Sequence, residues 1–464
     1  MKRRTFLKTM AATAFGFQVV PGFVLGGNGQ TPPSRKLNLA AIGAGGRAAS
    51  NLKEMDGENM VALCDVDDRR AGPMFKKFPD AQQFKDFRKL LDAVGDKIDG
   101  VVVSTPDHTH AVAATAAMRR GKHVYCEKPL THSVAEVRAL RKAAKARNLI
   151  TQVGNQGHSS DSIRVFCEWI WDGAIGNVTE VHAGRHTKYD GYFQIKKLDQ
   201  VRKERPPVPP ELDWNLWQGP APVRPYHPAY VPVTWRGWMT YGTGVLGDWV
   251  CHVVDPVFWA LDLDMPTSIQ AETDGYDPGK HSDLYPDGTK ITFEFPAKGK
   301  RGPVKLVWYD GQRTIPRPDD LEADRKVVET GAVVIGDRGK ITYGSHGAGS
   351  CRIIPAIEDA GIPTAGAEDS AFACQSPERL ARRDSRRSSG RFVFRVRRTI
   401  DGDRFARRDC HPFHRPEAPL QRAHDAVHQL PRSQRAPFRL VSPWLEPLTK
   451  FSLNETDKTE IASP

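Results

Sequence analysis

The 464-residue chain has few features of a disulfide-bonded, zinc-binding or membrane-spanning protein. Its seven cysteines are odd in number and form no Cys-x-x-Cys pair, which argues against both a zinc ribbon and a disulfide framework. The apolar stretch from Thr9 to about Gly26 contains Pro21 and falls short of the roughly 20 uninterrupted apolar residues of a stable span. Cys64 and Cys126 are therefore expected to be small buried apolar residues.

Most of the net positive charge lies at the two ends of the chain. Residues 1–33 contain four basic and no acidic side chains, and residues 356–464 contain 19 basic and 15 acidic ones. Of the net charge of +12, the two ends therefore supply +8 and the middle of the chain only +4. That balance requires no polyanionic partner, so nucleic acid is not expected. Length and composition instead indicate a globular protein of two or three domains.

The first 33 residues are predicted to be an export signal. Arg3-Arg4-Thr5-Phe6-Leu7-Lys8 precedes the weakly apolar stretch and resembles the twin-arginine signal of bacterial export. A buried amphipathic helix is the alternative, but paired arginines at an extreme N-terminus rarely lie against a core. We therefore expect a periplasmic or otherwise exported protein that contacts the membrane only through this segment.

A strand, a glycine turn and a helix follow in that order. Leu37–Ile42 is a short apolar run, residues 43–48 read Gly-Ala-Gly-Gly-Arg-Ala, and a helical pattern continues through Met55. In such a turn Gly43 permits the tight bend, Gly45 lets a pyrophosphate approach the backbone, and Ala48 allows close helix packing. This order predicts a dinucleotide-binding site.

A second strand, Asn59–Cys64, ends at Asp65, which follows Gly43 by 22 positions. A carboxylate there is suited to accept hydrogen bonds from the adenosine ribose, which favours NAD over NADP, although Arg47 weakens that preference. The alternative is a simple turn with Asp65 as a cap.

Further strands are predicted within residues 99–110, before the polar loop, and at residues 122–126, with a helix from about Ala111 to Arg120 between them. The first strand is expected to end in a polar loop, and the second leads into Glu127-Lys128-Pro129. Alternation of strands and helices is typical of a doubly wound parallel sheet. Pro129 fixes the turn after Lys128, so its ammonium group is presented at the end of the strand.

These motifs together resemble the glucose–fructose oxidoreductase, inositol dehydrogenase and rhizopine-catabolism family (Gfo/Idh/MocA). They are the glycine-rich turn, the Ser-Thr-Pro-Asp-His-Thr-His sequence at residues 104–110 and the Glu-Lys-Pro motif. The resemblance implies an α/β protein in which a Rossmann sheet is followed by an α+β domain with a large, mostly antiparallel open sheet. Such a sheet often mediates oligomerisation, which implies a homo-oligomer.

The resemblance also implies which residues bind the cofactor. We expect NAD, with NADP as the alternative, to be bound by Gly43, Gly45, Gly46, Arg47, Asp65, Ser104, Thr105, Pro106, His108, Glu127 and Lys128. In the family, Glu127 and Lys128 lie beside the nicotinamide, and Lys128 assists catalysis.

The region after Gln156 is rich in aromatic residues and proline. The indole of Trp235 is suited to form an apolar face of a carbohydrate-binding site, with Arg236 and His227 as partners of sugar hydroxyls, although ordinary core packing explains such residues equally well. His158, in a segment that resembles the family's domain junction, completes the predicted substrate contacts.

Asp248 and His252 are the strongest candidates for chemistry. A helix beginning near Gly247 places them at i and i+4 on one face. Removing hydride from a carbinol requires a base for its hydroxyl proton, and a histidine with charged neighbours can titrate near neutral pH. The family match supports His252 as general acid/base, with Asp248 and Lys128 orienting it and polarising the substrate oxygen. From spacing alone, Asp248 as an N-cap and His252 as a core histidine remain open. No metal is expected, although Asp255 keeps a mononuclear site conceivable.

Past Pro355 the composition changes. Residues 341–449 contain no lysine, and residues 376–440 contain 17 arginines without helical or strand periodicity. An Arg-rich disordered tail is one interpretation. The other is a frameshift near Pro355: a shift of one nucleotide allows four ordered segments, beginning at Ala356, Gln375, Gly390 and Val427, to resemble the family's own C-terminal sequence. We therefore expect 356–464 to be an aberrant, mostly unpacked tail.

The predicted organisation is a signal segment at 1–33, a Rossmann domain at 34–155, an incomplete substrate domain at 156–355 and the tail at 356–464. The predicted function is hydride transfer between a retained nicotinamide cofactor and a hydroxyl of a sugar or polyol. Because free NAD(H) is not expected outside the cytoplasm, an exported enzyme needs a redox-neutral cycle. An NAD-using glycoside hydrolase or lyase is one alternative, and a non-catalytic sugar- or dinucleotide-binding remnant is another.

Overall fold

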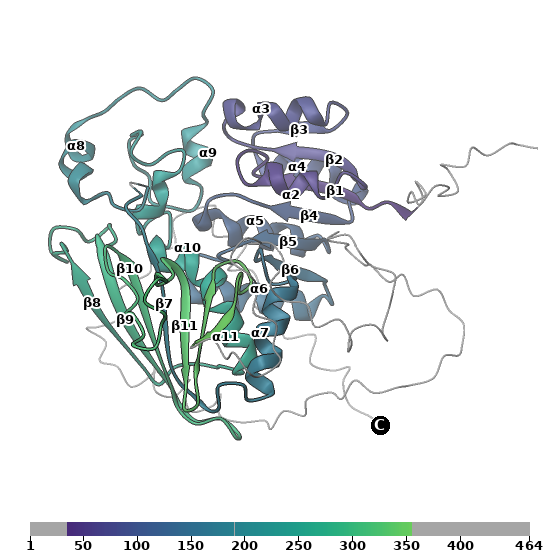
Figure 1. Ribbon diagram of the computed structural model, residues 1–464. Helices are drawn as coiled ribbons and strands as arrows, with labels where there is room; N and C mark the ends of the chain where they lie inside the picture. The colour runs from purple at the N-terminus through teal and green to yellow at the C-terminus, as the bar shows by residue number, and fades with distance from the viewer. Residues whose placement is uncertain (1–34, 190, 355–464) are drawn as a thin grey trace, which may run out of the picture. The chain divides into compact units, whose positions relative to one another are not determined.

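The computed structural model describes residues 35–189 and 191–354, so the predictions for the signal segment and for residues 356–464 lie outside the described residues. The chain first forms a six-stranded sheet in the order β3-β2-β1-β4-β5-β6, with every neighbouring pair parallel (Figure 1). Its strands are β1 (Asn38–Ile42), β2 (Asn59–Cys64), β3 (Gln82–Phe84), β4 (Gly100–Val103), β5 (His123–Glu127) and β6 (Thr151–Gly154). The strand order reverses between β1 and β4, which is where such sheets bind ligands at their carboxyl ends.

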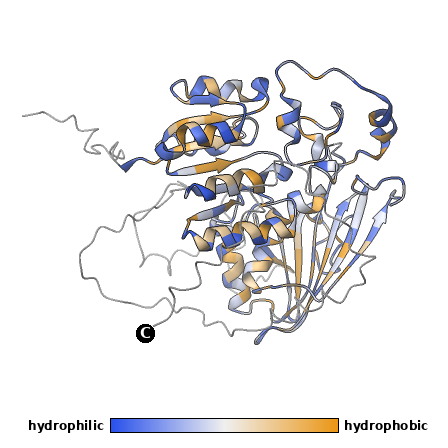
Figure 2. Ribbon diagram, turned by 180° about the vertical axis from the view of Figure 1, so that it is seen from behind, coloured by the Kyte–Doolittle hydropathy of each residue, from blue (hydrophilic) through white to orange (hydrophobic). Residues whose placement is uncertain are grey.

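Helices connect these strands: α2 (Ala48–Lys53), α3 (Asp68–Lys77), α4 (Phe87–Val94), α5 (Asp107–Arg119) and α6 (Val134–Ala146), with a 3-10 turn η3 (Gly95–Lys97) after α4. The central strands are almost completely buried, and their apolar character is visible in Figure 2. Such continuous apolar runs are typical of parallel strands covered on both faces. The predicted doubly wound sheet is confirmed.

Helix α5 begins four residues before the predicted start, so the segment expected to be a polar loop is its first turn. Pro106 is extended at the N-cap, and the negative charge of Asp107 is favourable in a first turn. This turn buries Asp107, His108 and His110.

A second, seven-stranded sheet has the order β13-β12-β11-β7-β10-β9-β8. Only β7 and β10 pair in parallel, so the predicted mostly antiparallel sheet is confirmed. Its strands are β7 (Val178–His186), β8 (Ser268–Asp274), β9 (Gly288–Phe295), β10 (Val304–Gly311), β11 (Thr330–Gly336), β12 (Lys340–Gly344) and β13 (Arg352–Ile354).

Helices α7 (Asp161–Trp171), α10 (Gly244–Val253) and α11 (Asp255–Ala260) contribute to one apolar core with this sheet. The core combines Phe166 of α7 and Val253 of α10 with Val181 of β7. Helix α10 starts at Gly244, three residues before the predicted start, where a positive φ of 66° suits glycine. This helix carries Asp248 and His252.

Between β7 and α10 the chain forms an excursion with only short helices: η4 (Ile195–Lys197), α8 (Leu198–Lys203), α9 (Trp214–Gln218) and η5 (Thr234–Gly237). It is held by its own aromatic core, in which Trp214 and Trp217 stack with ring centroids 4.9 Å apart. None of the helices in the described part of the chain is long and apolar enough to cross a membrane.

Candidate active site

The glycine-rich turn packs tightly between two other segments. Gly43 has a φ of 84°, and a Cβ atom there would lie 2.8 Å from backbone atoms of Ser104 and Thr105. The Gly45 amide donates to Asp65 Oδ2 at 2.7 Å, and a Cβ on Gly45 would lie 2.8 Å from Arg70. Any side chain on Gly43 or Gly45 would therefore disturb the packing of this turn.

Replacement of Gly43 by Ala is expected to weaken NAD binding at least tenfold. The new Cβ meets backbone rather than a flexible side chain, and the left-handed conformation is unfavourable for alanine. Fluorescence titration with NADH measures the effect. Gly72→Ala is a matched control, because nothing lies within 4 Å of a Cβ at that position. Equal NADH affinity in Gly43→Ala and the unmodified protein would contradict the assignment of this turn.

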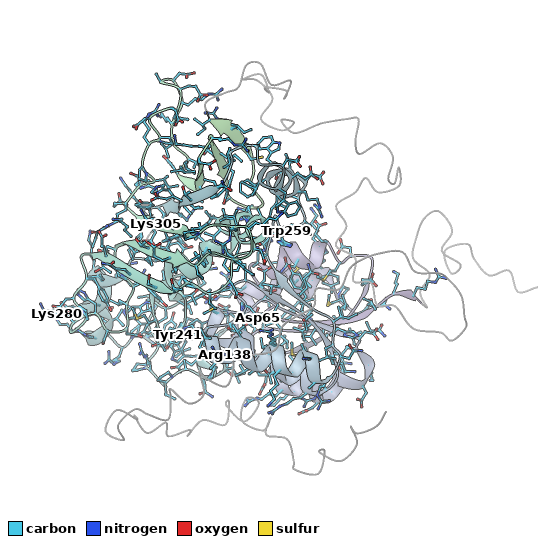
Figure 3. All side chains as sticks on the ribbon, turned by 90° about the horizontal axis from the view of Figure 1, so that it is seen from below. Asp65, Arg138, Tyr241, Trp259, Lys280 and Lys305 are labelled. Carbon is cyan, nitrogen blue, oxygen red and sulfur yellow. The ribbon has the colours of Figure 1, made fainter. Side chains whose placement is uncertain are left out.

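Asp65 follows β2, as predicted, and lies towards the middle of the view in Figure 3. Burial raises the pKa of this carboxyl, opposed by the amides of Asp67 and Gly45 and by the charge of Arg70. Sequence analysis missed Arg70, whose guanidinium group covers the turn at Gly46. The only feature of the sequence that could have indicated Arg70 is its position five residues after Asp65.

Thr105 Oγ1 is buried and has no hydrogen-bond partner among the described residues. It lies in the segment that faces Gly43, at the carboxyl end of β4. An orphaned hydroxyl beside a bare glycine turn fits a polar ligand at this edge of the sheet. The residues present therefore fit a dinucleotide, although the individual roles of Gly46, Ser104, Thr105 and Pro106 stay predictions.

The prediction that His108 binds the cofactor is corrected. Its side chain is buried, with Nδ1 3.2 Å from the Tyr241 carbonyl oxygen and Nε2 3.0 Å from that of Trp217. Burial lowers its pKa to about 3. Both ring nitrogens face backbone carbonyls because the first turn of α5 is directed into the fold, so His108 joins α5 to the aromatic excursion.

His110 connects the two loops that carry predicted cofactor contacts. Its Nδ1 lies 2.8 Å from the Pro129 carbonyl oxygen and its Nε2 lies 2.7 Å from that of Thr105. Burial alone lowers the pKa of this histidine, but Cys126 and Asp107 outweigh burial and raise it to about 10. A protonated ring can donate to both carbonyls at once, so His110 holds the two loops together.

Glu127 is buried and fully bonded. Its Oε1 accepts hydrogen bonds from Asn51 Nδ2 at 2.7 Å and from Gln156 Nε2 at 2.9 Å, and Arg47 Nε lies 3.6 Å away. Glu127 thereby joins β5 to α2 and to the segment after β6. Its position beside the nicotinamide stays a prediction.

Lys128 and Asp248 form a buried ion pair. Lys128 Nζ lies 2.6 Å from Asp248 Oδ1 and donates to the Asp248 carbonyl oxygen at 3.0 Å. Arg236 Nε lies 3.1 Å from Asp248 Oδ2, which also accepts a hydrogen bond from the Tyr192 hydroxyl. Burial raises the pKa of Asp248, but Arg236 and Lys128 together hold it at about 2. One carboxylate therefore binds two cations and remains ionised.

His252 is buried on the same helix, and its Nδ1 has no partner among the described residues. Its ring stacks on His346, with centroids 4.1 Å apart. Burial, the charge of Lys128 and His346 lower its pKa to about 3, although Asp248 opposes the shift. This differs from the expectation of titration near neutral pH, because desolvation and cations outweigh the carboxylate. The ring is consequently neutral at neutral pH.

The four residues predicted to contact substrate do not lie together in one site of the structure. Arg236 belongs to the Asp248 cluster, with its guanidinium group 4.2 Å from the Trp235 ring centroid. Trp235 is buried in the aromatic core, so its prediction as a carbohydrate-binding face is corrected. His158 is half-exposed, with Nδ1 2.8 Å from Asp255 Oδ2 and its ring stacked on Trp259.

The prediction that His227 contacts substrate is also corrected. Its buried Nδ1 accepts a hydrogen bond from the Ala229 amide, and its Nε2 lies 3.2 Å from Glu204 Oε2. Both nitrogens therefore serve the excursion's own structure.

Three neighbours of the Asp248 cluster escaped sequence analysis: Arg185, Tyr192 and His346. Arg185 is near the end of β7, Tyr192 follows that strand, and His346 lies in the loop between β12 and β13. No motif marks them, since each is far in sequence from Lys128. Only the glycines flanking His346 give a local signal.

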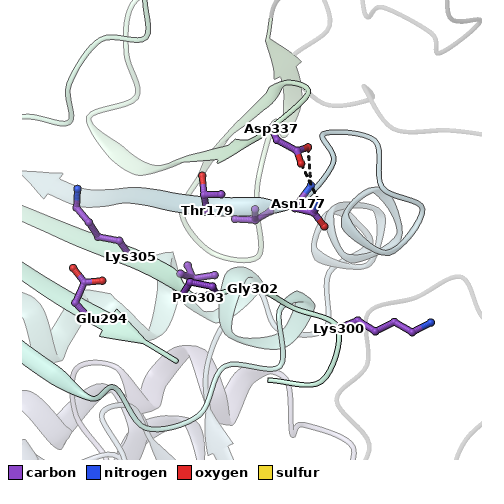
Figure 4. Close-up of a pocket in the computed structure, with 10 residues that line it drawn as sticks. Asn177, Thr179, Glu294, Lys300, Gly302, Pro303, Lys305 and Asp337 are labelled. Atoms are coloured by element: carbon purple, nitrogen blue, oxygen red, sulfur yellow. Dashed lines mark hydrogen bonds between the residues drawn. The ribbon is translucent and has the colours of Figure 1, made fainter. Parts of the chain in front are cut away.

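A separate cavity of about 620 Å³ lies at the end of the second sheet where β7 and β10 begin (Figure 4). None of the predicted site residues lines it; its lining residues are Asn177, Val178, Thr179, Glu294, Lys300, Gly302, Pro303, Val304, Lys305 and Asp337. Within residues 35–189 and 191–354, no group of three or more His, Cys, Asp or Glu side chains is arranged to hold a metal ion.

Comparison with known proteins agrees with this geometry. Residues 37–155 match the model of an oxidoreductase family with an NAD-binding Rossmann fold, and residues 161–301 match the model of that family's C-terminal alpha/beta domain. Together the matches span more than half of the chain. The fold and site define an NAD-binding α/β protein with a second, sheet-based domain. The chain belongs to the Gfo/Idh/MocA oxidoreductase family.

Similar curated proteins include a levoglucosan dehydrogenase of Pseudarthrobacter phenanthrenivorans, 25% identical over 42% of this chain and 40% of that protein. Inositol 2-dehydrogenase 1 of Saccharopolyspora erythraea is 31% identical over 32% of this chain and 44% of its own. A glycosyl hydrolase family 109 protein of Stenotrophomonas maltophilia is 35% identical over 27% and 29% respectively. The matched part spans less than half the length of each relative.

Proposed function

We propose that this protein transfers hydride between NAD and a CH–OH group of a sugar or polyol. The observation that carries the proposal is the buried Lys128–Asp248 pair beside the neutral ring of His252, with Glu127 joining Lys128 to the glycine-rich turn. A proton acceptor and a fixed ammonium group are the two elements that oxidation of an alcohol requires. The names of the levoglucosan and inositol dehydrogenases support this substrate class.

His252, Lys128 and Asp248 have separate roles in this reaction. The neutral imidazole of His252 accepts the substrate's hydroxyl proton, and Lys128 donates a hydrogen bond to the same oxygen. Asp248 holds Lys128 in place and compensates its charge. NAD, when bound, accepts the hydride. The experiment that tests the proposal is to denature the purified full-length protein, identify any released nucleotide, and assay NADH formation with sugars and polyols. Absence of NAD binding would refute it.

Asp65 is expected to select NAD over NADP. An added 2′-phosphate near this carboxylate is repelled, so Asp65→Asn should reduce the preference for NAD at least tenfold. Dissociation constants for NADH and NADPH measure the preference. Asp68→Asn, an exposed aspartate at the start of α3, is the control. An unchanged ratio in Asp65→Asn would assign Asp65 a purely structural role in bracing Gly45.

We also propose that the protein is exported through the twin-arginine pathway, which the Arg3-Arg4 sequence supports. Export of a folded protein allows a dinucleotide to be carried along and reused in a redox-neutral cycle. Fusion of residues 1–33 to a reporter, with Arg3 and Arg4 changed to lysine in the control, tests the pathway. Export of the double-lysine form would contradict it.

A glycoside hydrolase or lyase that uses NAD transiently is the second candidate. The similarity to a glycosyl hydrolase family 109 protein favours it, as does the need for a redox-neutral cycle in an exported enzyme. Product release from a glycoside without net NADH formation distinguishes it from a dehydrogenase. A binding protein without turnover is the third possibility, and it predicts dinucleotide binding without either reaction.

We propose further that the reading frame changes near Pro355. The absence of lysine from residues 341–449 and the 17 arginines of residues 376–440 support a frameshift. Resequencing the locus tests it, and a single intact frame would refute it. In the frame-restored form we expect a homo-oligomer, which sedimentation of both forms would reveal.

A further inference from the structure

The cluster around Asp248 contains more positive than negative charge. Lys128 and Arg236 both pair with the Asp248 carboxylate, which burial does not prevent from ionising. Arg185 adds a third cation close enough to act electrostatically on Asp248 and Tyr192. Asp107 is also close, and burial raises its pKa. A neutral sugar hydroxyl has no need of this excess.

Arg185 contacts an indole ring and a threonine hydroxyl, neither of which carries a negative charge. It lies on the core-facing side of β7, with its guanidinium carbon 3.5 Å from the centroid of the Trp249 ring. Its Nη1 donates to the Thr330 hydroxyl at 3.3 Å, and its Nε is buried without a partner among the described residues. Within that part of the chain no carboxylate forms an ion pair with it. The indole face restricts the guanidinium group, whose buried Nε is left as an unsatisfied donor within the described residues.

His346 presents a second donor beside Arg185. Its exposed ring stacks on His252 and lies edge-on to Trp249, with centroids 5.6 Å apart. The Ser345 hydroxyl lies 2.8 Å from its Nδ1, which leaves Nε2 for a ligand. Burial and the positive charges of Lys128, Arg47 and Arg185 lower the pKa of this ring.

The backbone holds His346 firmly in an unfavourable conformation. Its φ is 59°, in the left-handed region, and its amide donates to the His252 carbonyl oxygen at 2.9 Å. The next residue, Gly347, accepts hydrogen bonds from the hydroxyls of Ser160 and Ser162. Strain that the surroundings maintain is concentrated at functional positions.

We propose that Arg185 and His346 bind an anionic group of the substrate, so that the preferred substrate is a sugar carrying a carboxylate or phosphate. The inference rests on the proposed function for the reaction at the neighbouring hydroxyl. Arg185 supplies a planar guanidinium edge suited to an oxyanion, and His346 supplies one further hydrogen bond. The glycine-rich turn predicted to bind the dinucleotide's phosphates belongs to β1 and α2, whereas Arg185 and Trp249 belong to β7 and α10.

The test is calorimetric titration of the full-length protein, saturated with NADH, with D-glucose, D-glucuronate and D-glucose 6-phosphate. An anionic sugar is expected to bind at least tenfold more tightly than glucose. Arg185→Gln should abolish this preference, Arg185→Lys should keep part of it, and His346→Gln should reduce it. Arg313→Gln, which removes an arginine paired with Glu272 and Asp274 elsewhere on the same sheet, should keep it in full.

The two anionic sugars distinguish the kinds of anionic group. Tighter binding of glucuronate identifies a carboxylate, and tighter binding of glucose 6-phosphate identifies a phosphate. Equal affinities, no binding of any of the three sugars, or a preference that survives in a folded Arg185→Gln protein would overturn the inference. Circular dichroism establishes folding, and Arg185→Lys provides the test if the glutamine variant unfolds.

Repeating the titration without NADH separates the two proposals. Arg185-dependent anion binding without any NADH binding would refute the dehydrogenase alone, whereas NADH binding without anion preference would refute this inference alone.

Discussion

Replacement of His252 by Asn is expected to lower kcat by a factor of about 10²–10⁴, the usual contribution of a positioned general base. Asparagine has similar size but cannot accept the substrate's proton. Because His252 belongs to the second domain and the glycine-rich turn to the first, the affinity for NADH should change little. Steady-state rates with a sugar or polyol substrate, together with an NADH titration, measure both quantities.

His281→Asn is a suitable control, since His281 accepts a hydrogen bond from the Asp277 amide in a turn after β8. That variant should retain full activity. A His252→Asn enzyme with near-normal kcat would show that another group takes the proton, and the assignment of His252 would be wrong.

The pH dependence of the unmodified enzyme provides an independent check. The pKa of His252 is lowered to about 3, so kcat/KM should show no acidic limb near pH 6.5 from this residue. Replacement of Lys128 by Met removes one of the charges that disfavour the imidazolium. The pKa of His252 should then rise, and the activity that remains should fall at a higher pH than in the unmodified enzyme.

Replacement of Asp248 by Asn should produce the largest loss of stability, about 3 kcal/mol in the free energy of unfolding. The change leaves Lys128 and Arg236 in a largely buried cluster without their shared counter-charge, and it deprives the Tyr192 hydroxyl of its charged acceptor. Urea unfolding monitored by circular dichroism measures the effect.

Asp274→Asn is the matched control, because Asp274 pairs with Arg313 at a half-exposed position where an ion pair contributes at most about 1 kcal/mol. Equal stability losses in the two variants would show that the Asp248 cluster has no special structural role.

The stability difference between the unmodified protein and Asp248→Asn should also depend on pH. The carboxyl pKa is lowered from 3.8 to about 2 on folding, so between these values the unfolded state binds more protons. The contribution of ionisation, about 2 kcal/mol, is therefore complete above pH 4 and is lost as the pH falls from about 4 to about 2. A difference that stays constant from pH 5 to pH 2.5 would contradict the assigned pKa.

The first sheet was predictable because its information is local. Each strand is a short apolar run ended by a turn residue, and the strand Asn59–Cys64 coincides with β2. The helix starts at Asp107 and Gly244 were less predictable, since polar or glycine residues begin both helices and resemble loop sequence. At both sites the first turn is buried against other segments, which the local sequence does not reveal.

The candidate site shows the same division. The positions of Gly43, Glu127 and Lys128 at the carboxyl edge of the sheet follow from the sequence, because strand ends and tight turns are encoded by neighbouring residues. The sequence likewise identified Asp248 and His252 as one helix face. Which groups surround them, and hence which of the two is ionised, depends largely on Lys128, Tyr192 and His346, which lie far from this helix in the sequence.

The sequence by itself therefore determined the fold class, the dinucleotide-binding edge and the identity of the main polar residues. The tertiary structure alone decided that His108 and His227 serve packing, that His252 is held neutral, and that Arg185 and His346 lie beside it. The physical reason is that turns and strand ends are short-range properties of the chain. Desolvation and charge pairing instead depend on which distant segments exclude water from the same volume.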